Sequence, residues 1–175
     1  MYAIPILFAL SAAPAAAGPY EVELRGEIRT VKAGPTTRAA LIVDDDTHVL
    51  AARRPDLEEE LRNLDGATVV VAGYRDDALR PPGVDVLVET YAIVDVGDGR
   101  VPRLGRLAAL VLDGETKLLF VDEAGRADIL PESWKKRMLE HVGAKLWILG
   151  RRAKDGSYTP TRFQILRSTA QETPQ

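Results

Sequence analysis

Gly66–Gly73, with the sequence GATVVVAG, occurs a second time in diverged form as Gly143–Gly150, GAKLWILG. In both copies Gly-Ala opens a short run of apolar residues, and a second Gly closes it. Apolar runs of this length between glycines are typical of buried strands. The recurrence after 77 positions, from 66 to 143, predicts that the chain contains two copies of one small β unit.

Apolar residues at helical spacing precede each copy and predict a short helix before each strand. They are Leu57, Leu61 and Leu64 in the first unit and Trp134, Met138 and Val142 in the second. Gly66 and Gly143 are expected to end these helices as C-caps. The charged run Glu58–Glu60 is interpreted as a solvated helix face.

Short strand patterns separated by turn residues fill the rest of each unit. In the first unit they cover 20–29, 38–43, 48–52, 66–73 and 84–94; in the second they cover 104–107, 117–121, 126–130, 144–149 and 161–167. Gly26 falls on the apolar face of the first strand, where we expect a bend or a bulge. Each unit therefore has three strands, a helix and two more strands.

This order of elements is that of a five-stranded Greek-key OB barrel, in which a helix plugs one end of the barrel. The expected fold class is all-β with short helices: two tandem five-stranded OB-like Greek-key barrels, each with one helix between strands 3 and 4. Another small β-rich fold with one helix is the alternative. The expected boundaries are 1–18 for a signal peptide, 19–96 for the first OB-like domain, 97–102 for a linker, 103–168 for the second OB-like domain and 169–175 for a flexible tail.

The N-terminal residues resemble a secretion signal. Ile4–Leu10 is a short apolar run, and Ala15–Ala17 before Gly18 forms a small-residue cleavage site. No Lys or Arg precedes the apolar run, and a buried N-terminal strand is the alternative. The pattern predicts a periplasmic protein. Later apolar segments are too short for a membrane helix, so we expect a protein that does not span the membrane.

Cysteine is absent from the chain. An exported protein without Cys has no disulfides and no thiol for a lipid anchor, so packing alone must stabilise it. Two units of about 75 residues would each have a modest core and are expected to pack against one another.

The two halves differ in charge. Residues 20–99 contain 9 basic and 17 acidic residues, a balance of −8, whereas residues 100–175 contain 14 and 9, a balance of +5. Opposite charges on adjacent units suggest either that the halves dock on each other or that they bind partners of opposite sign. The third interpretation is that surface residues of the two repeats diverged without a functional reason and that the difference in charge has no role.

The first unit resembles the bacterial OB-fold (BOF) family of small periplasmic proteins. The residues that carry the resemblance are Val22–Ile28, with the pattern V-x-L-x-G-x-I, then Val69–Gly73 and Val86–Val88. In the second unit, the D-x-x-G turn Asp122–Gly125 and Trp134 fit the same pattern. The resemblance covers most of the chain after the signal, once per unit, but its motifs are degenerate.

This resemblance implies a protein that binds ligands or outer-membrane partners and is associated with envelope stress tolerance, since members of the family are not known as enzymes. Two departures weaken it. The family usually has one such domain, whereas this chain has two. The first unit has Asp44–Asp46 where the D-x-x-G turn would lie.

Asp44, Asp46 and His48 are weak candidates for a metal site, because carboxylate oxygens and an imidazole can bind divalent cations. The stretch lacks the spacing of an EF-hand loop. A solvated hairpin turn explains the acidic residues more simply. No cofactor is expected.

A basic cluster is the main candidate for binding a ligand or a partner. It comprises Lys135, Lys136, Arg137, Arg151, Arg152 and Lys154, all in the second unit. It could contact an anionic lipid, nucleic acid or the acidic first unit, or be an ordinary solvated surface. Trp147 is a further candidate, because the strand 144–149 is apolar on both faces. Its outer face is expected to form the contact between the units or a docking site, unless a helix or loop covers it.

No nucleophile elbow, zinc-protease motif or phosphate-binding loop is present. OB folds often bind single-stranded nucleic acid through exposed aromatic residues, for which the candidates are Tyr74, Tyr91, Tyr158 and Phe163. We therefore expect a non-enzymatic periplasmic binding protein whose partner is an envelope protein or a small ligand such as a cationic peptide or an oligosaccharide. A nucleic-acid-binding protein is the alternative if the N-terminal signal is misread. A hydrolase with dispersed carboxylates comes third.

Overall fold

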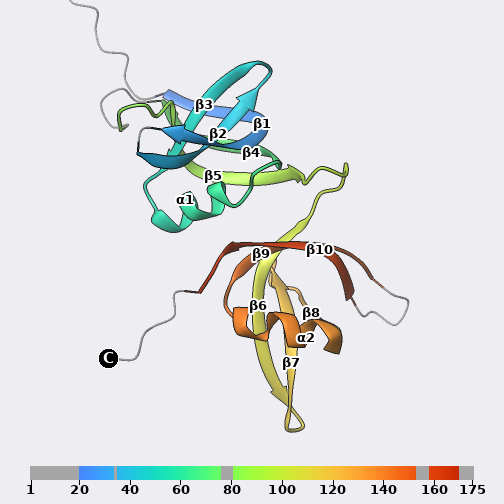
Figure 1. Ribbon diagram of the computed structural model, residues 1–175. Helices are drawn as coiled ribbons and strands as arrows, with labels where there is room; N and C mark the ends of the chain where they lie inside the picture. Colours follow the sequence, from blue (N-terminus) through green and yellow to red (C-terminus); the bar gives the residue numbers. More distant parts are fainter. Residues whose placement is uncertain (1–19, 34, 76–80, 153–157, 170–175) are drawn as a thin grey trace, which may run out of the picture.

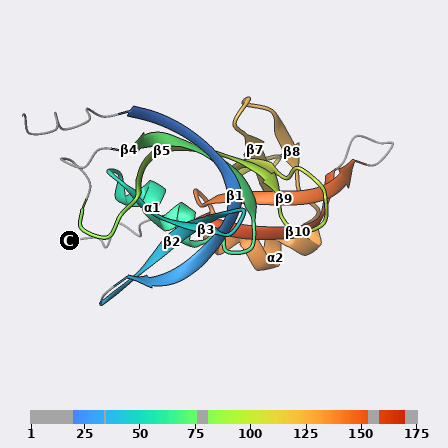
Figure 2. The ribbon, with the colours of Figure 1, turned by 90° about the horizontal axis from the view of Figure 1, so that it is seen from above.

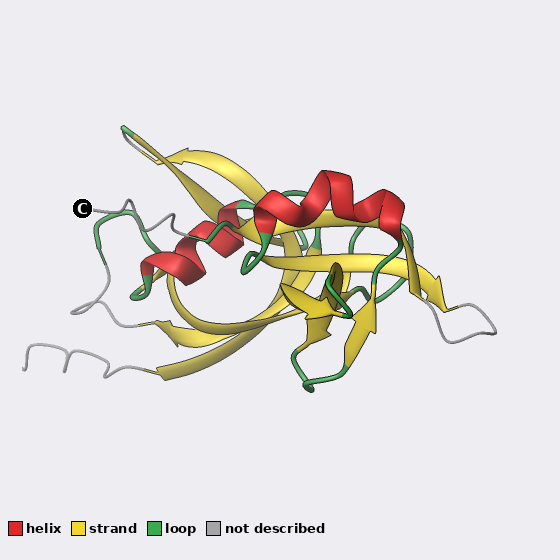
Figure 3. Ribbon diagram, turned by 90° about the horizontal axis from the view of Figure 1, so that it is seen from below, coloured by secondary structure: helices red, strands yellow, loops and turns green. Residues whose placement is uncertain are grey.

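The computed structural model describes residues 20–33, 35–75, 81–152 and 158–169. The predicted signal peptide and most of the predicted tail lie outside these residues. In the described part, strands dominate and form two five-stranded sheets accompanied by short helices (Figure 3). This confirms the expected all-β class and is consistent with an OB-like fold.

The first unit contains β1 (Tyr20–Ala33), β2 (Thr36–Val43), β3 (Asp46–Ala52), α1 (Pro55–Arg62), β4 (Thr68–Arg75) and β5 (Val86–Asp95). The second contains β6 (Arg103–Leu112), β7 (Glu115–Asp122), β8 (Ala127–Ile129), α2 (Glu132–Met138), the 3₁₀ helix η1 (Leu139–His141), β9 (Lys145–Arg152) and β10 (Tyr158–Arg167). In both units a helix lies between the third and fourth strands. The predicted linker, 97–102, lies between β5 and β6.

The first sheet is a closed barrel with the strand order β1-β2-β3-β5-β4, visible as a ring in Figure 2. A parallel pairing of β3 with β5 closes it, and the other neighbours are antiparallel. Strand β1 pairs with β4 through Glu27 and with β2 from Glu27 onward. A Cβ on Gly26, beside this changeover, would lie 2.1 Å from the carbonyl oxygen of Ile42. The glycine therefore permits the strand to pass close to β2 as it changes partners.

The second sheet has the corresponding strand order, β10-β9-β6-β7-β8. Its third strand, β8, has only three residues, and within the described residues the sheet stays open between β8 and β10. Gly105 in β6 is the equivalent of Gly26, because it also lies close to the neighbouring strand: a Cβ there would lie 2.3 Å from the carbonyl oxygen of Val121. The second sheet is thus an open counterpart of the first.

The repeated stretch adopts the same local structure in both units. Gly66 N–H donates to the carbonyl of Ile28 at 2.8 Å, and Gly143 N–H donates to the carbonyl of Leu107 at 2.8 Å. Both glycines have positive φ, +81° and +88°, which favours glycine. The predicted C-caps are wrong, because α1 ends with Asn63 as its C-cap, three residues before Gly66, and Val142 is the C-cap of η1 before Gly143. In both units, therefore, the turn after the helix is tied to the first strand by the same hydrogen bond.

Two large apolar clusters form the interior. One lies inside the first barrel and contacts α1. The other lies between the second sheet and α2. Three residues of the second unit, Trp147, Leu149 and Leu166, belong to the first cluster. Helix α1 lies between the first barrel and strands β9 and β10 (Figure 1). The two units are therefore packed against each other, and their division into separate domains stays a prediction.

Candidate functional site

Glu60 of α1 lies at the contact between the units and is only 1% exposed. Its carboxylate accepts hydrogen bonds from Lys145 Nζ of β9 and from the Tyr91 hydroxyl of β5, both at 2.8 Å. Arg167 of β10 lies 3.4 Å from its other oxygen. The interpretation of Glu58–Glu60 as a solvated face is thus wrong for Glu60. The second unit covers this residue and supplies cations that offset the burial of its charge.

A signal for this burial is present in the sequence. Glu60 follows Leu57 by three positions and precedes Leu64 by four, so it shares their face of the helix. Leu57 and Leu64 are buried, as that spacing predicts. An acidic residue on an apolar helix face indicates a buried ion pair, but the sequence does not show which cation approaches it.

Tyr91 and Lys145 complete this cluster. The Lys145 ammonium lies 5.3 Å from the centre of the Tyr91 ring and 3.7 Å from Glu123. Burial, and next the negative charge of Glu60, raise the pKa of the Tyr91 phenol far above its ordinary value. The phenol therefore stays protonated and serves as a hydrogen-bond donor.

Further contacts join the acidic helix α1 to the basic strand β10. Asn63 Nδ2 donates to the carbonyl of Leu166 at 2.8 Å, and Arg167 forms an ion pair with Asp56. Along the same strand, Arg162 donates to the carbonyl of Val96 at 3.1 Å. Of the interpretations of the charge imbalance, the mutual docking of the halves matches this contact.

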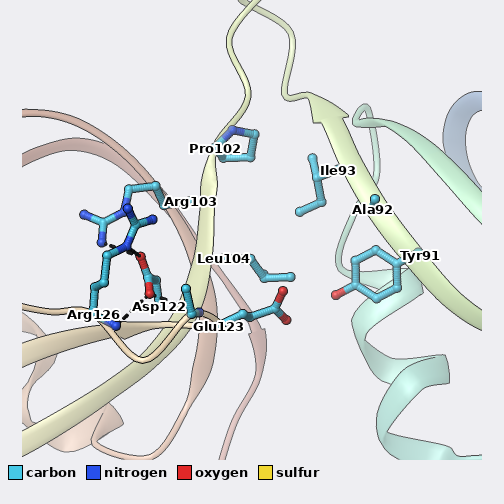
Figure 4. Close-up of a pocket in the computed structure, with 10 residues that line it drawn as sticks. Tyr91, Ala92, Ile93, Pro102, Arg103, Leu104, Asp122, Glu123 and Arg126 are labelled. Carbon is cyan, nitrogen blue, oxygen red and sulfur yellow. Dashed lines mark hydrogen bonds and ion pairs between the residues drawn. The ribbon is translucent and has the colours of Figure 1, made fainter.

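A cleft of about 340 Å³ opens beside this cluster, between the two units (Figure 4). Tyr91, Ala92 and Ile93 of β5 form one wall. Pro102, Arg103 and Leu104 and the turn after β7 form the other. In Figure 4, Leu104 and Glu123 lie between the Tyr91 side and the cluster of Arg103, Asp122 and Arg126. The cleft thus combines an apolar lining with charged groups.

Arg103 anchors the charged wall. Its guanidinium donates to Asp122 at 2.9 Å and to Asp128 at 2.5 Å. The same group lies between the rings of Phe120 and Tyr158, 5.1 and 5.0 Å from their centres. A planar cation held by two carboxylates and two rings has a fixed orientation.

Asp122 begins the D-x-x-G turn, and its carboxylate organises that turn. It accepts hydrogen bonds from the backbone N–H of Ala124 and Arg126 and from the side chain of Arg126, at 3.1, 2.9 and 2.9 Å. Burial alone would raise the pKa of Asp122, but the hydrogen bonds from Arg103 and Arg126 outweigh it and lower the pKa to about 2. Asp122 is therefore ionised at neutral pH.

Two ionisable groups of the cleft have pKa values shifted away from neutral pH. Asp122 and Tyr91 each keep one protonation state near neutral pH, so neither is poised to exchange a proton. The side chains of Glu123 and Arg126 at the rim are 63% and 74% exposed and carry opposite charges. A ligand could place apolar groups against Ile93 and Leu104 and polar groups at this rim.

No described residue of the predicted basic cluster lines the cleft, although Arg152 shares the carboxylate of Asp128 with Arg103 of the cleft wall. Several of the described members have partners. Lys135 pairs with Glu132 at 3.1 Å, Arg152 pairs with Asp128 at 2.5 Å, and Arg137 lies 5.7 Å from the centre of the Trp134 ring. Lys136 and Arg151 are exposed, and Lys154 lies outside the described residues. The role of the basic cluster in binding stays a prediction.

Trp147, the other predicted binding residue, is 4% exposed and packs with the core of the first unit. Its indole N–H has no hydrogen-bond partner among the described residues. The predicted outer face of β9 is therefore covered by the first unit, as one of the sequence-based alternatives proposed.

The acidic stretch forms the turn between β2 and β3. Asp44, with φ +53°, and Asp46 are exposed, whereas the His48 ring contacts Arg75 at 3.1 Å. Within the described ranges, no group of three acidic, His or Cys side chains is arranged to hold a metal ion. The turn explains the acidic residues without a ligand.

The aromatic candidates for nucleic-acid binding have other surroundings. Tyr158 is buried and Phe163 packs edge-on against Trp134, with ring centres 5.0 Å apart. Tyr74 lines a surface groove of about 440 Å³ together with Glu21, Glu23 and Glu89. Carboxylates around that ring would repel phosphates, which disfavours nucleic acid there.

No protein-family model matches the chain. No curated protein matches it in sequence. Among solved structures, the crystal structure of the tetrameric p202 HIN2 is 12% identical, with 85% of this chain and 91% of that chain covered and a TM-score of 0.25. A TM-score this low supports no conclusion about fold or function. Within the described residues, no helix is long and apolar enough to cross a membrane.

Proposed function

We propose that this is a non-enzymatic binding protein of the bacterial cell envelope, and that it takes a short polypeptide segment of an envelope partner into the cleft between its two units. The observation that carries the proposal is the cleft itself, which has an apolar lining and a rim of opposite charges. Clefts at the junction of two units are common ligand sites, and volumes of about 300–1,000 Å³ are typical of them.

A polypeptide segment suits the cleft better than a strongly charged ligand. The charges of Glu123 and Arg126 cancel. The rim therefore offers a hydrogen-bond acceptor and a hydrogen-bond donor to the backbone of a bound peptide. Ile93 and Leu104 offer apolar surface to a side chain. The ion pairs of Arg103 with Asp122 and Asp128 hold that wall in place before any ligand arrives, which lowers the cost of binding.

We further propose that each unit is a diverged OB-like Greek-key barrel. Three features support it: the corresponding strand orders, the helix between the third and fourth strands, and the equivalent bonds of Gly66 and Gly143. The sequence resemblance to the BOF family agrees with this assignment. In the second unit the short β8 leaves the barrel open.

The proposed compartment rests on the signal-like pattern of Ile4–Gly18. Export would bring the cleft into contact with envelope proteins. Cell fractionation and N-terminal sequencing of the purified protein test this. Recovery from the periplasm with a new N-terminus near residue 18 or 19 is expected. A cytoplasmic protein that starts at Met1 would contradict it.

A peptide array made from envelope protein sequences tests the binding function directly. The purified protein and its Ala92→Trp variant are applied to the array, because Ala92 lines the cleft and a Trp side chain would fill it. Thr37→Trp, at an exposed position of β2, is the matched control.

We expect a defined set of peptides to bind the wild type and Thr37→Trp, and to lose at least tenfold in affinity for Ala92→Trp. Peptides that bind all three proteins equally would show that the cleft is not the site. If no peptide binds the wild type above background, the proposal is wrong.

A further inference from the structure

The β6–β7 hairpin carries an apolar surface that the cleft does not use. Leu110, Val111 and Leu112 at its end are 48%, 69% and 49% exposed. The hairpin projects from the second sheet and ends in a two-residue turn, Asp113-Gly114 (Figure 1). Both turn residues have positive φ, +53° and +78°, as in the type I′ turns that join two strands tightly. The exposed residues therefore belong to a well-formed strand.

One edge of this hairpin is free. Strand β6 pairs with β7 out to Leu112, but with β9 only over Arg103–Arg106. Just beyond, the backbone of Leu107 donates to Ala144 and accepts from Gly143, at 3.1 and 2.8 Å. Among the described residues, no strand pairs with the β6 edge after that point.

The backbone groups on this edge point outward. Successive residues of a strand direct their N–H and C=O groups to opposite sides, so Ala109 and Val111 share the direction of Leu107, away from β7. Strand edges of folded proteins usually carry a Lys, a Pro or a bulge that prevents pairing. The segment Ala108–Leu112, with the sequence AALVL, has none of these.

We propose that Ala108–Leu112 is a dimerisation edge, at which two copies of this chain pair antiparallel about a twofold axis through Leu110. In this register Ala109 of one copy lies opposite Val111 of the other, and each such pair exchanges both backbone hydrogen bonds. In this register the segment Ala108–Leu112 of one copy pairs along its whole length with the same segment of the other copy.

The side chains fit this arrangement. Leu110 faces its own copy and Ala108 faces Leu112, so every directly opposed pair is apolar, and apolar cross-strand pairs stabilise a sheet. Antiparallel pairing also brings the acidic tip of one hairpin, with Asp113, toward the base of the other, where Arg106 is exposed. The edge is thus complementary to itself in shape and in charge.

A membrane is a poorer partner for the same surface. Asp113 and Glu115 flank the tip and would have to leave water if the hairpin entered a bilayer. The unpaired backbone groups of Ala109 and Val111 would find no partners in lipid. A second copy of the edge satisfies those groups.

The natural absence of Cys makes a cross-linking test direct. In the dimer, the two Leu110 residues form a non-hydrogen-bonded pair with Cα atoms about 4.5 Å apart, which suits a disulfide. Leu112→Cys is the matched control, because Leu112 is equally exposed but would lie about 14 Å from its copy at about 3.4 Å per residue.

Under mild oxidation we expect Leu110→Cys to form a covalent dimer at least tenfold faster than Leu112→Cys. Equal rates would overturn the register that we propose. Sedimentation equilibrium of the unmodified protein is the second measurement. We expect a monomer–dimer equilibrium that Leu110→Lys shifts at least tenfold toward monomer, because it opposes two ammonium groups.

Ile129→Lys, at another exposed apolar position, should leave the equilibrium unchanged. Three outcomes would overturn the proposal: a wild type that stays monomeric up to millimolar concentration, a dimer that Leu110→Lys does not weaken, or a monomer that binds anionic phospholipid vesicles through the hairpin.

Discussion

At the scale of single residues, Glu60 joins groups from both units. It holds Lys145 and Arg167 of the second unit and Tyr91 of the first around one buried carboxylate. Removing one partner of a buried ion pair leaves the other charge without compensation, which costs far more than losing an exposed pair. Asp122 has a comparable role in the second unit, where it joins Arg103 to the turn at the cleft.

Glu60→Gln should lower the free energy of unfolding by about 3 kcal/mol, the lower end for a broken buried pair, because Lys145 keeps some contact with water. Urea denaturation followed by circular dichroism measures the change. Glu59→Gln, on the neighbouring, less buried position, should change it by at most about 0.5 kcal/mol. If the two variants were equally stable, the buried pair would have no role in stability.

The low pKa of Asp122 has a consequence for stability in acid. Its pKa falls from an ordinary value of 3.8 to about 2 on folding, so the folded state favours the ionised form. This stabilisation is fully present above pH 4 or so and is lost as the pH falls through about 2. We expect the stability difference between wild type and Asp122→Asn to shrink across that range. A difference that stayed constant from pH 6 to pH 2 would contradict this account.

At the scale of elements, glycines determine how closely the strands approach. Gly26 and Gly105 lie where the first strand of each unit passes its neighbour, and Gly73 and Gly150 lie in the fourth strands. A Cβ at any of these four positions would come within 2.1–2.5 Å of a carbonyl oxygen of the paired strand. The repeated glycines thus allow the strands of both sheets to approach this closely.

Gly26→Ala should destabilise the protein by about 2–3 kcal/mol, since backbone must move to admit the methyl group. Gly97→Ala is the control, because the space around Gly97 is open and only its positive φ opposes a side chain, at a cost of about 1 kcal/mol. Thermal unfolding of both variants checks the order. A more stable Gly26→Ala would show that β1 does not pass β2 this closely.

The elements could be predicted from sequence because their signals are local. The Gly-bounded apolar run and the leucines at helical spacing gave the order of strands and helices in both units. Some predicted ends were wrong: the last strand of the first unit, expected at 84–94, is Val86–Asp95, and the first strand of the second unit, expected at 104–107, extends over Arg103–Leu112. Strand ends depend on pairing across the sheet, which a single sequence does not specify.

The cleft could not be predicted, because it depends on contacts between distant parts of the chain. Asp122–Gly125 is recognisable as a turn, but nothing local places it opposite Tyr91. Lys145 follows the echoed Gly-Ala and gives no sign that it reaches Glu60, 85 positions away. The basic residues around α2 are clustered in sequence, but none of them lines the cleft.

At the scale of the whole molecule, the two units pack against each other and are expected to move together. Trp147, Leu149 and Leu166 pack into the first core, and α1 bonds to β9 and β10 through side chains. Because the cleft lies between the units, its shape depends on this contact. The binding proposal therefore requires that the two units do not move apart in solution.

Fluorescence of Trp147 tests this contact most directly. In a Trp134→Phe variant, Trp147 is the only indole and reports the contact alone. We expect a blue-shifted emission that acrylamide quenches poorly, and a change only at the denaturant concentration at which circular dichroism shows global unfolding. A red-shifted, readily quenched Trp147 in the folded protein would show that the units separate, and would contradict this account.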